Sequence, residues 1–336
     1  MLFVGVDGSK DNLTVALLQS DQEAHPQRLG SFPNRPEKFD SLLQQVQRLS
    51  QGQEVVWVIE PCGGYELPLM HWLYEHQQHI LYPNPRQVRQ WQQSRGCRAK
   101  TDPLDSEMLA LYGAEHFKDL HLWQPWPEPA QRLLRLAERL QELEAEWRRE
   151  QNRLEAYQRR GIPPDTPEIR DLDEHIQYLK RLIKRTKKHI SHLYRDFPQL
   201  DGLRRRLLSV PGVGEKSVNV LVALILRWAQ LGRQDVKGLV AYLGLDPCIR
   251  QSGKQAPRGH ISKQGPPRWR SLLVAAARGG LRQVQSPLTR FYRRLRERGK
   301  SHLLALVAAA RKIVVWAWAV YRSGGEFDLQ RHLALA

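Results

Sequence analysis

Cysteine is scarce in this sequence. The 336 residues contain three cysteines, at positions 62, 97 and 248, and no two of them form a Cys-x-x-Cys pair. Such isolated cysteines argue against a zinc ribbon and against a disulfide framework. They are typical of proteins in a reducing compartment, so we expect a cytoplasmic protein.

Long apolar segments free of charge are also missing. Asp7 and Lys10 interrupt the first apolar run, which argues against a signal peptide. The most apolar later stretch, residues 303–320, carries Arg311 and Lys312 at its centre. Charges at that position are costly in a bilayer, so we expect a buried helix and no membrane partner.

Acidic residues are few overall and nearly absent from two segments. The chain has 52 Lys and Arg against 35 Asp and Glu, a formal net charge of +17 and a pI of about 10.1. Residues 76–101 contain no acid, and residues 250–300 contain only Glu297. This imbalance predicts a nucleic-acid partner. The candidate contacts are Arg86, Arg89, Arg95, Arg98, Lys100, Arg250, Lys254, Arg258, Lys263, Arg268 and Arg270.

The hydrophobic pattern predicts three parts, with boundaries at about 1–125, 126–200 and 201–336. The first part reads as α/β, because short apolar runs joined by turns precede runs that alternate with helical patterns. It should form a mixed sheet with helices packed on it. The expected strands are 2–6, 13–18, 28–32, 55–59 and 79–82, and the expected helices are 36–49 and 65–76.

The other two parts are predicted to be helical. Apolar residues recur at 3-4 spacing on both sides of a breaker at Gly161–Asp165, which indicates two long helices with coiled-coil seams. These helices can pair with each other or with another subunit. In the third part, residues 210–217 resemble the hairpin of helix-hairpin-helix DNA-binding modules, although a plain inter-helix turn fits equally well.

Four acids are placed where a metal site would need them. Asp7 and Glu60 end two apolar runs, while Asp102 and Asp105 open a helical pattern and are three residues apart. Side chains at that spacing share one face of a helix. Carboxylates suit Mg²⁺ or Mn²⁺, and carboxylate-held metals commonly serve phosphoryl transfer. Taken singly, Asp102 also fits a helix cap and Asp7 a turn residue.

Two serines in the basic region are candidate nucleophiles. Ser252 lies between Arg250 and Lys254, which could stabilise negative charge on a phosphate. Serine needs activation by a base or a metal, and no local His–Asp partner is present. Ser262 is a rival on the same grounds, and either can also be an ordinary loop serine.

These motifs, taken in order, resemble the DEDD-type transposases of bacterial insertion sequences, the insertion-sequence-110 group, which includes the pilin-gene invertases. The similarity runs nearly end to end. Its N-terminal motifs are Gly5-Val6-Asp7-Gly8-Ser9-Lys10, Ile59-Glu60-Pro61-Cys62-Gly63-Gly64-Tyr65 and Lys100-Thr101-Asp102-Pro103-Leu104-Asp105. Its C-terminal motifs are Pro211-Gly212-Val213-Gly214, Ala241-Tyr242-Leu243-Gly244-Leu245, Ser252-Gly253 and Gly259-His260-Ile261-Ser262-Lys263-Gln264-Gly265.

The resemblance implies a RuvC-like, RNase H-type fold for the first part, then coiled-coil helices, then a mostly α-helical transposase domain. It implies Asp7, Glu60, Asp102 and Asp105 as the catalytic Mg²⁺ ligands and Ser252 as the DNA nucleophile, with Ser262 less favoured. It also implies a structured noncoding bridge RNA that pairs with donor and target DNA. Cys62 departs from the Thr or Ser more usual in the family, and Trp269 replaces a common Leu.

We therefore expect an RNA-guided DNA recombinase, bacterial and nucleoid-associated, that acts as a dimer or tetramer. In the expected reaction Ser252 attacks a DNA phosphate with metal assistance, and a covalent phosphoserine precedes strand exchange. One alternative is a metal-dependent, junction-resolving nuclease that uses water. The other is a non-catalytic nucleic-acid-binding scaffold.

Overall fold

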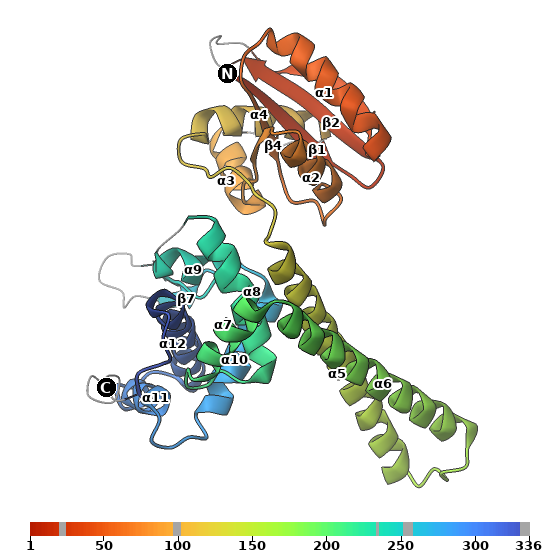
Figure 1. Ribbon diagram of the computed structural model, residues 1–336, viewed down its shortest axis with the longest axis vertical. Coiled ribbons are helices and arrows are strands. Elements are labelled where there is room, and N and C mark those ends of the chain that lie inside the picture. Colours follow the sequence, from red (N-terminus) through yellow and green to blue (C-terminus); the bar gives the residue numbers. More distant parts are fainter. Residues whose placement is uncertain (20–24, 97–101, 233–234, 251–257, 330–336) are drawn as a thin grey trace. The chain divides into compact units, whose positions relative to one another are not determined.

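The computed structural model describes residues 1–19, 25–96, 102–232, 235–250 and 258–329 (Figure 1). For Asp102, Ile249, Arg250, Arg258 and Gly259 it describes the backbone and not the side chain. The chain forms two compact units, unit 1 from Met1 to Pro125 and unit 2 from Trp126 to Ala336. The long helices at residues 128–196 therefore belong to unit 2, together with the C-terminal helices.

Unit 1 contains the predicted mixed sheet, which is confirmed. Its strand order is β3-β2-β1-β4-β5. Strands β1, β2 and β3 are antiparallel neighbours, whereas β1 with β4 and β4 with β5 are parallel. The bounds are β1 Leu2–Gly8, β2 Asn12–Gln19, β3 Gln27–Pro33, β4 Val55–Ile59 and β5 His79–Leu81.

Helices cover both faces of this sheet, and the alternation along β1 explains which side chain meets which helix. Leu2, Val4 and Val6 join the core formed with α1 (Pro36–Ser50) and α2 (Leu67–Glu75). Phe3 points the other way, into a second core with α3 (Pro85–Ser94) and α4 (Asp102–His116). The odd-numbered residues of β1 therefore face α4.

Unit 2 begins with a helical hairpin. Helices α5 (Glu128–Arg159) and α6 (Pro167–Asp196) pack along each other and extend away from the other helices of unit 2 (Figure 1). Of the two pairings compatible with the sequence, the structure shows the one within the chain.

The remaining helices of unit 2 form a single apolar core with the base of this hairpin. A two-stranded antiparallel ribbon, β6 (Pro247–Arg250) with β7 (Arg258–Ile261), interrupts them. The helices are α7 Pro198–Leu208, α8 Glu215–Gln230, α9 Val236–Tyr242, α10 Pro267–Gly280, α11 Pro287–Glu297 and α12 His302–Ser323.

Among the described helices, only α12 is long and apolar enough to cross a membrane. Its side chains instead supply the centre of the unit 2 core: Leu306, Ala310, Ile313 and Ala317 are fully buried. The apolar stretch expected to be a buried helix is thus part of a protein core.

Candidate active site

Helix α4 crosses the sheet in contact with the backbone of β1. A Cβ atom at Gly5 would overlap the Ser106 carbonyl oxygen and would lie 2.6 Å from the Ala110 nitrogen. Nearer the other end of the helix, Gly113 lies against Phe3 and Val58. Helix α4 therefore runs antiparallel to β1, and its first turn lies toward the carboxyl end of that strand.

Three of the predicted acids lie at positions that border this face of the sheet. Asp7 is two residues beyond Gly5 on β1, so its side chain faces α4, and Glu60 is two residues beyond Val58, which packs in the same core. Asp105 is 7 % exposed and lies one turn before Leu109, on the stripe of α4 that faces the sheet. Strand alternation and helix periodicity thus place all three residues on the side of the sheet that faces α4.

The fourth acid, Asp102, is the first residue of α4, and only its backbone is described. Among the described side chains, no three His, Cys, Asp or Glu form a group that could hold a metal ion. The donor chemistry of Asp7, Glu60 and Asp105 nevertheless fits a hard divalent cation, because every donor is a carboxylate oxygen.

Beside these acids lies a hydrogen-bonded group that we did not predict. Glu66 is 2 % exposed; its carboxylate accepts hydrogen bonds from Cys62 N at 3.1 Å, Cys62 Sγ at 3.0 Å, Gly64 N at 2.9 Å and the Tyr82 hydroxyl at 2.6 Å. Burial opposes ionisation of Glu66, but the bonds from Cys62 and Tyr82 prevail and lower its pKa. The partners are up to 16 residues apart, so no local pattern identifies this group.

The same group makes Cys62 a poor nucleophile. Burial, followed by the hydrogen bond to Glu66 and the charge of that carboxylate, raises the pKa of Cys62 to about 12. Asp7 adds a smaller effect in the same direction. Cys62 therefore stays a neutral thiol near the acids and donates a hydrogen bond to Glu66.

The candidate nucleophile Ser252 lies outside the described residues, as do Arg98, Lys100 and Lys254. In the sequence, Ser252 falls between strands β6 and β7, which the composition of this Gly-rich segment did not predict. Arg250 pairs with Arg258 in the register of this ribbon.

The rival serine, Ser262, has a structural partner at the base of the ribbon. Its hydroxyl donates to the Asp246 carboxylate, and its backbone N–H donates to the Asp246 carbonyl at 3.0 Å. These two bonds join the residue before β6 to the residue after β7. Ser262 is therefore placed to fix the ends of the segment that contains Ser252.

Two glycines of the C-terminal motifs allow close backbone contact near this base. A Cβ at Gly244 would lie 2.6 Å from Gln264 N, and one at Gly265 would overlap the Tyr242 carbonyl oxygen. Gly244 also has a φ of +65°, which L residues with side chains rarely adopt. The two motifs are thus packed against each other, backbone to backbone.

Several predicted nucleic-acid contacts have partners within the protein. Arg95 pairs with Glu115 and stacks over Trp91, with 4.8 Å from its guanidinium carbon to the ring centre. Arg268 binds Glu142 at 2.9 Å. Arg270 donates to the Gly265 carbonyl. By contrast, Arg86 and Lys263 are exposed, and Arg89 is half-buried beside Gln92.

Comparison with known proteins extends these observations over most of the chain. Residues 4–163 match the DEDD_Tnp_IS110 family model, described as a transposase, and residues 204–293 match the model of the IS116/IS110/IS902 transposase family. The pilin gene-inverting proteins of Moraxella lacunata and Moraxella bovis are each 25% identical over 332 residues, 98% of both chains. A probable family 20 transposase of Pseudomonas aeruginosa is 30% identical over 155 residues, 44% of each chain.

These matches define a DNA transposase or recombinase. The chain belongs to the IS110 family of insertion-sequence transposases.

Proposed function

We propose that the protein is an RNA-guided recombinase that joins donor and target DNA through a phosphoserine at Ser252. The observation that carries the proposal is the placement of these acids: Asp7 and Glu60 follow the paired residues Val6 and Ile59 of β1 and β4, and Asp105 is buried on the α4 stripe that faces the sheet. Asp102 begins the same helix.

The sheet order supports a RuvC-like, RNase H-type assignment for residues 1–125. Three antiparallel strands, β3-β2-β1, continue into the parallel pair β4-β5, and an α-helix crosses the face that carries the acids. Within unit 2, residues 126–200 would form the coiled-coil part and residues 201–336 the transposase domain.

The four acids would hold Mg²⁺ or Mn²⁺. Asp7 and Glu60 extend from adjacent parallel strands, and Asp105 is held by the packing of Leu109 against the sheet. When bound, the metal supplies charge stabilisation at the scissile phosphate and favours the deprotonated serine. The protein's own contribution is a rigid set of carboxylates on regular elements.

Ser252 would carry out the covalent step. Its Oγ attacks the phosphorus, the bond from phosphorus to the 3′ oxygen breaks, and the serine proton ends on that oxygen. The resulting phosphoserine keeps the phosphodiester energy, so a 3′-OH of the partner strand can attack it and release the serine hydroxyl. The acids belong to unit 1, whereas Ser252 belongs to the sequence of unit 2. The proposed reaction therefore needs a phosphate that both the metal-binding acids and Ser252 can reach.

The family resemblance also supports a bridge RNA and a homo-oligomer as partners. RNA contacts would fall to the segment around Arg86 and Arg89, and DNA contacts to the ribbon around Arg250, Arg258 and Lys263. A dimer or tetramer would allow one subunit's acids to serve another subunit's serine. In a bacterial cell the site of action would be the nucleoid.

Trapping the covalent intermediate tests this function. The protein is incubated with Mg²⁺, the element's flanking noncoding RNA and labelled donor and target DNA, and the products are resolved on a denaturing gel. We expect a DNA–protein adduct that Ser252→Ala and Asp102→Ala both abolish. Cleavage that survives Ser252→Ala without an adduct would instead show a nuclease that uses water.

A further inference from the structure

The C-terminal half of helix α6 has an outer face made almost wholly of cations. Between residues 180 and 195 it contains no acid and seven Lys or Arg, all exposed. We call this the α6 cationic face; its members are Lys180, Arg181, Lys184, Arg185, Lys187, Lys188 and Arg195.

The face lies away from the apolar seam of the hairpin. Leu179, Ile190 and Leu193 are buried against α5 and the base of the bundle. With 3.6 residues per turn, Arg185 and Lys188 lie on the opposite side of the helix from these residues. From Arg181 to Arg195 the face is about 21 Å long, the axial length of about six base pairs of duplex.

The partner helix α5 lacks this bias. It contains seven Arg and seven Glu and is therefore neutral overall, although it is slightly longer than α6. A coiled coil that only needed solubility would be served by such mixed charges. Solubility alone therefore does not explain why positive charge is concentrated on residues 180–195 of α6.

Few of these cations are neutralised by the protein. Among the described residues, acids within ion-pair distance are found only for Lys187, with Glu144 at 3.7 Å, and for Arg195, with its neighbour Asp196 at 3.8 Å. Arg181 lies over the ring of Tyr178. The rest of the face is open to a negatively charged partner.

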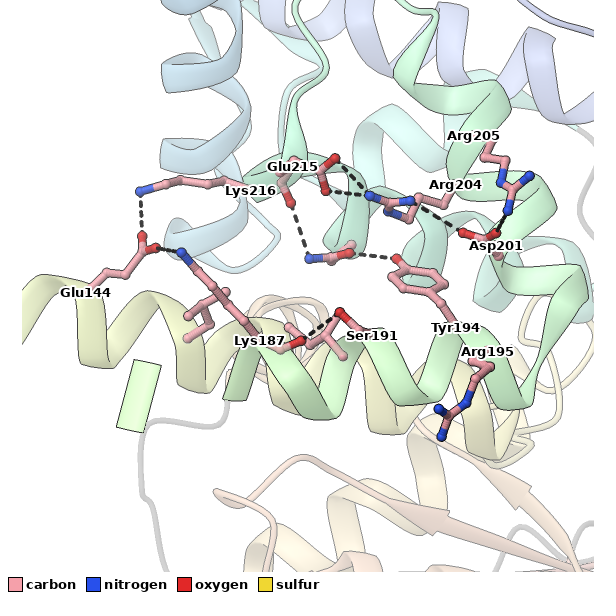
Figure 2. Close-up of a pocket in the computed structure, with 13 residues that line it drawn as sticks. Glu144, Lys187, Ser191, Tyr194, Arg195, Asp201, Arg204, Arg205, Glu215 and Lys216 are labelled. Carbon is pink, nitrogen blue, oxygen red and sulfur yellow. Dashed lines mark hydrogen bonds and ion pairs between the residues drawn. The ribbon is translucent and has the colours of Figure 1, made fainter. Parts of the chain in front are cut away.

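The C-terminal end of the face opens onto a cavity of about 590 Å³ (Figure 2). Lys187 and Arg195 of α6 line it together with Arg205 of α7 and Lys216 of α8. Its acids, Glu144, Asp201 and Glu215, are each engaged with Lys or Arg side chains of the wall. The basic surface therefore continues from the hairpin to the base of the transposase helices.

We infer that the α6 cationic face binds the sugar–phosphate backbone of duplex DNA outside the cleaved position. The inference rests on the DNA substrate of the proposed function but not on the serine chemistry. Regularly spaced Lys and Arg on a straight helix suit phosphate contacts, which position DNA without reading its sequence. The excess of positive charge also opposes pairing of this face with the same face of a second copy of the protein, because like charges repel.

The salt dependence of DNA binding tests the inference. Lys184→Gln, Arg185→Gln and Lys188→Gln are combined in the full chain, and affinity for a 30-base-pair duplex is measured by fluorescence anisotropy over a range of salt. Removing three phosphate contacts should lower the slope of log K against log salt by about 2–3 and weaken binding most at low salt. A Lys184→Arg, Lys188→Arg variant should keep the wild-type slope.

The matched control is Arg132→Gln, Arg149→Gln and Arg159→Gln, which removes the same charge from exposed positions of α5. The inference is overturned if the α6 variant keeps the wild-type slope, if the α5 control loses as much, or if only binding to an RNA duplex falls. A wild-type protein that binds no DNA would contradict the proposed function itself. Unchanged DNA binding by the α6 variant, by contrast, would contradict only the role given to the α6 cationic face.

Discussion

Asp7 on β1 and Glu60, the residue directly after β4, occupy matching positions beside two adjacent parallel strands. Each follows directly after the paired residues Val6 and Ile59, and each faces α4 because side chains alternate along a strand. This relationship follows from register alone: a shift of one residue in either strand would turn one acid to the other face of the sheet.

The close crossing at Gly5 should be sensitive to a single methyl group. Gly5→Ala would force α4 away from β1, because the new Cβ overlaps the Ser106 carbonyl oxygen. We expect a loss of about 1–3 kcal/mol in the free energy of unfolding, measured in urea, together with reduced adduct formation. The control is Gly279→Ala on α10, where no atom lies within 4 Å of the added methyl and stability should not fall.

Substitution of Ser252 and of Ser262 should have different effects, because we assign a catalytic role to Ser252 and a structural role to Ser262. Ser262→Ala removes the bond to Asp246 and should destabilise the protein by about 1 kcal/mol while still allowing adduct formation at a reduced rate. Ser252→Ala should leave stability unchanged and abolish the adduct. Denaturing gels and thermal unfolding of both variants check this, and an adduct retained only by Ser252→Ala would reverse the assignment.

The neutral state of Cys62 gives a pH prediction. In a Cys97→Ser, Cys248→Ser background, iodoacetamide should modify Cys62 slowly at pH 8.5, where a free cysteine is half ionised, and faster as the pH approaches about 12. Glu66→Gln removes the charge that helps raise this pKa, so it should increase the rate at pH 8.5. Equal rates in the two proteins would contradict the role given to Glu66.

The Glu66 carboxylate should also make the free energy of unfolding depend on pH. Because the folded pKa of Glu66 is lowered, its stabilising effect is complete above the ordinary value of 4.5 and is lost as the pH falls through the folded value. Glu66→Gln should therefore lower the free energy of unfolding at pH 7, and this difference should shrink below pH 4. A difference that stays constant with pH would show that ionisation is not involved.

Glu144 should stabilise the attachment of the helical hairpin to α8. Its carboxylate accepts a hydrogen bond from Lys216 at 2.5 Å and lies 3.7 Å from Lys187. Both lysines are largely exposed, so screening limits the expected loss in Glu144→Gln to about 1 kcal/mol. Glu146→Gln, for which no ion pair is found among the described residues, should cost less in the same urea titration.

The sequence predicts unit 1 well because its signals are local. The run Val55–Ile59 reads as a buried strand without reference to any other segment, and β4 has the same bounds. Hydrophobic spacing likewise predicts the helices on both sides of the Gly161–Asp165 breaker. The convergence of the acids stays a prediction from the family motifs, and the close crossing of α4 and β1 at Gly5 is compatible with it.

The elements that were missed depend on distant partners. Strands β6 and β7 are four residues long and contain Pro, Gly and Arg, so pairing and not composition defines them. Arg268 stays a predicted nucleic-acid contact, but its ion pair with Glu142, 126 residues away in the sequence, was not predicted. Glu66 stands directly before the start of α2 at Leu67, but this position does not identify its partner Tyr82, 16 residues away.

Binding of Mn²⁺ to the full chain tests the central claim, that acids from separate strands and from α4 form one metal site. Electron paramagnetic resonance of free Mn²⁺ is recorded during titration of wild type, Asp7→Asn, Glu60→Gln and, as a control, the exposed Asp40→Asn. The account predicts a saturable site, competed by Mg²⁺, that is weakened about tenfold or more by either active-site change and is unchanged in the control. Equal binding by all four proteins would contradict it.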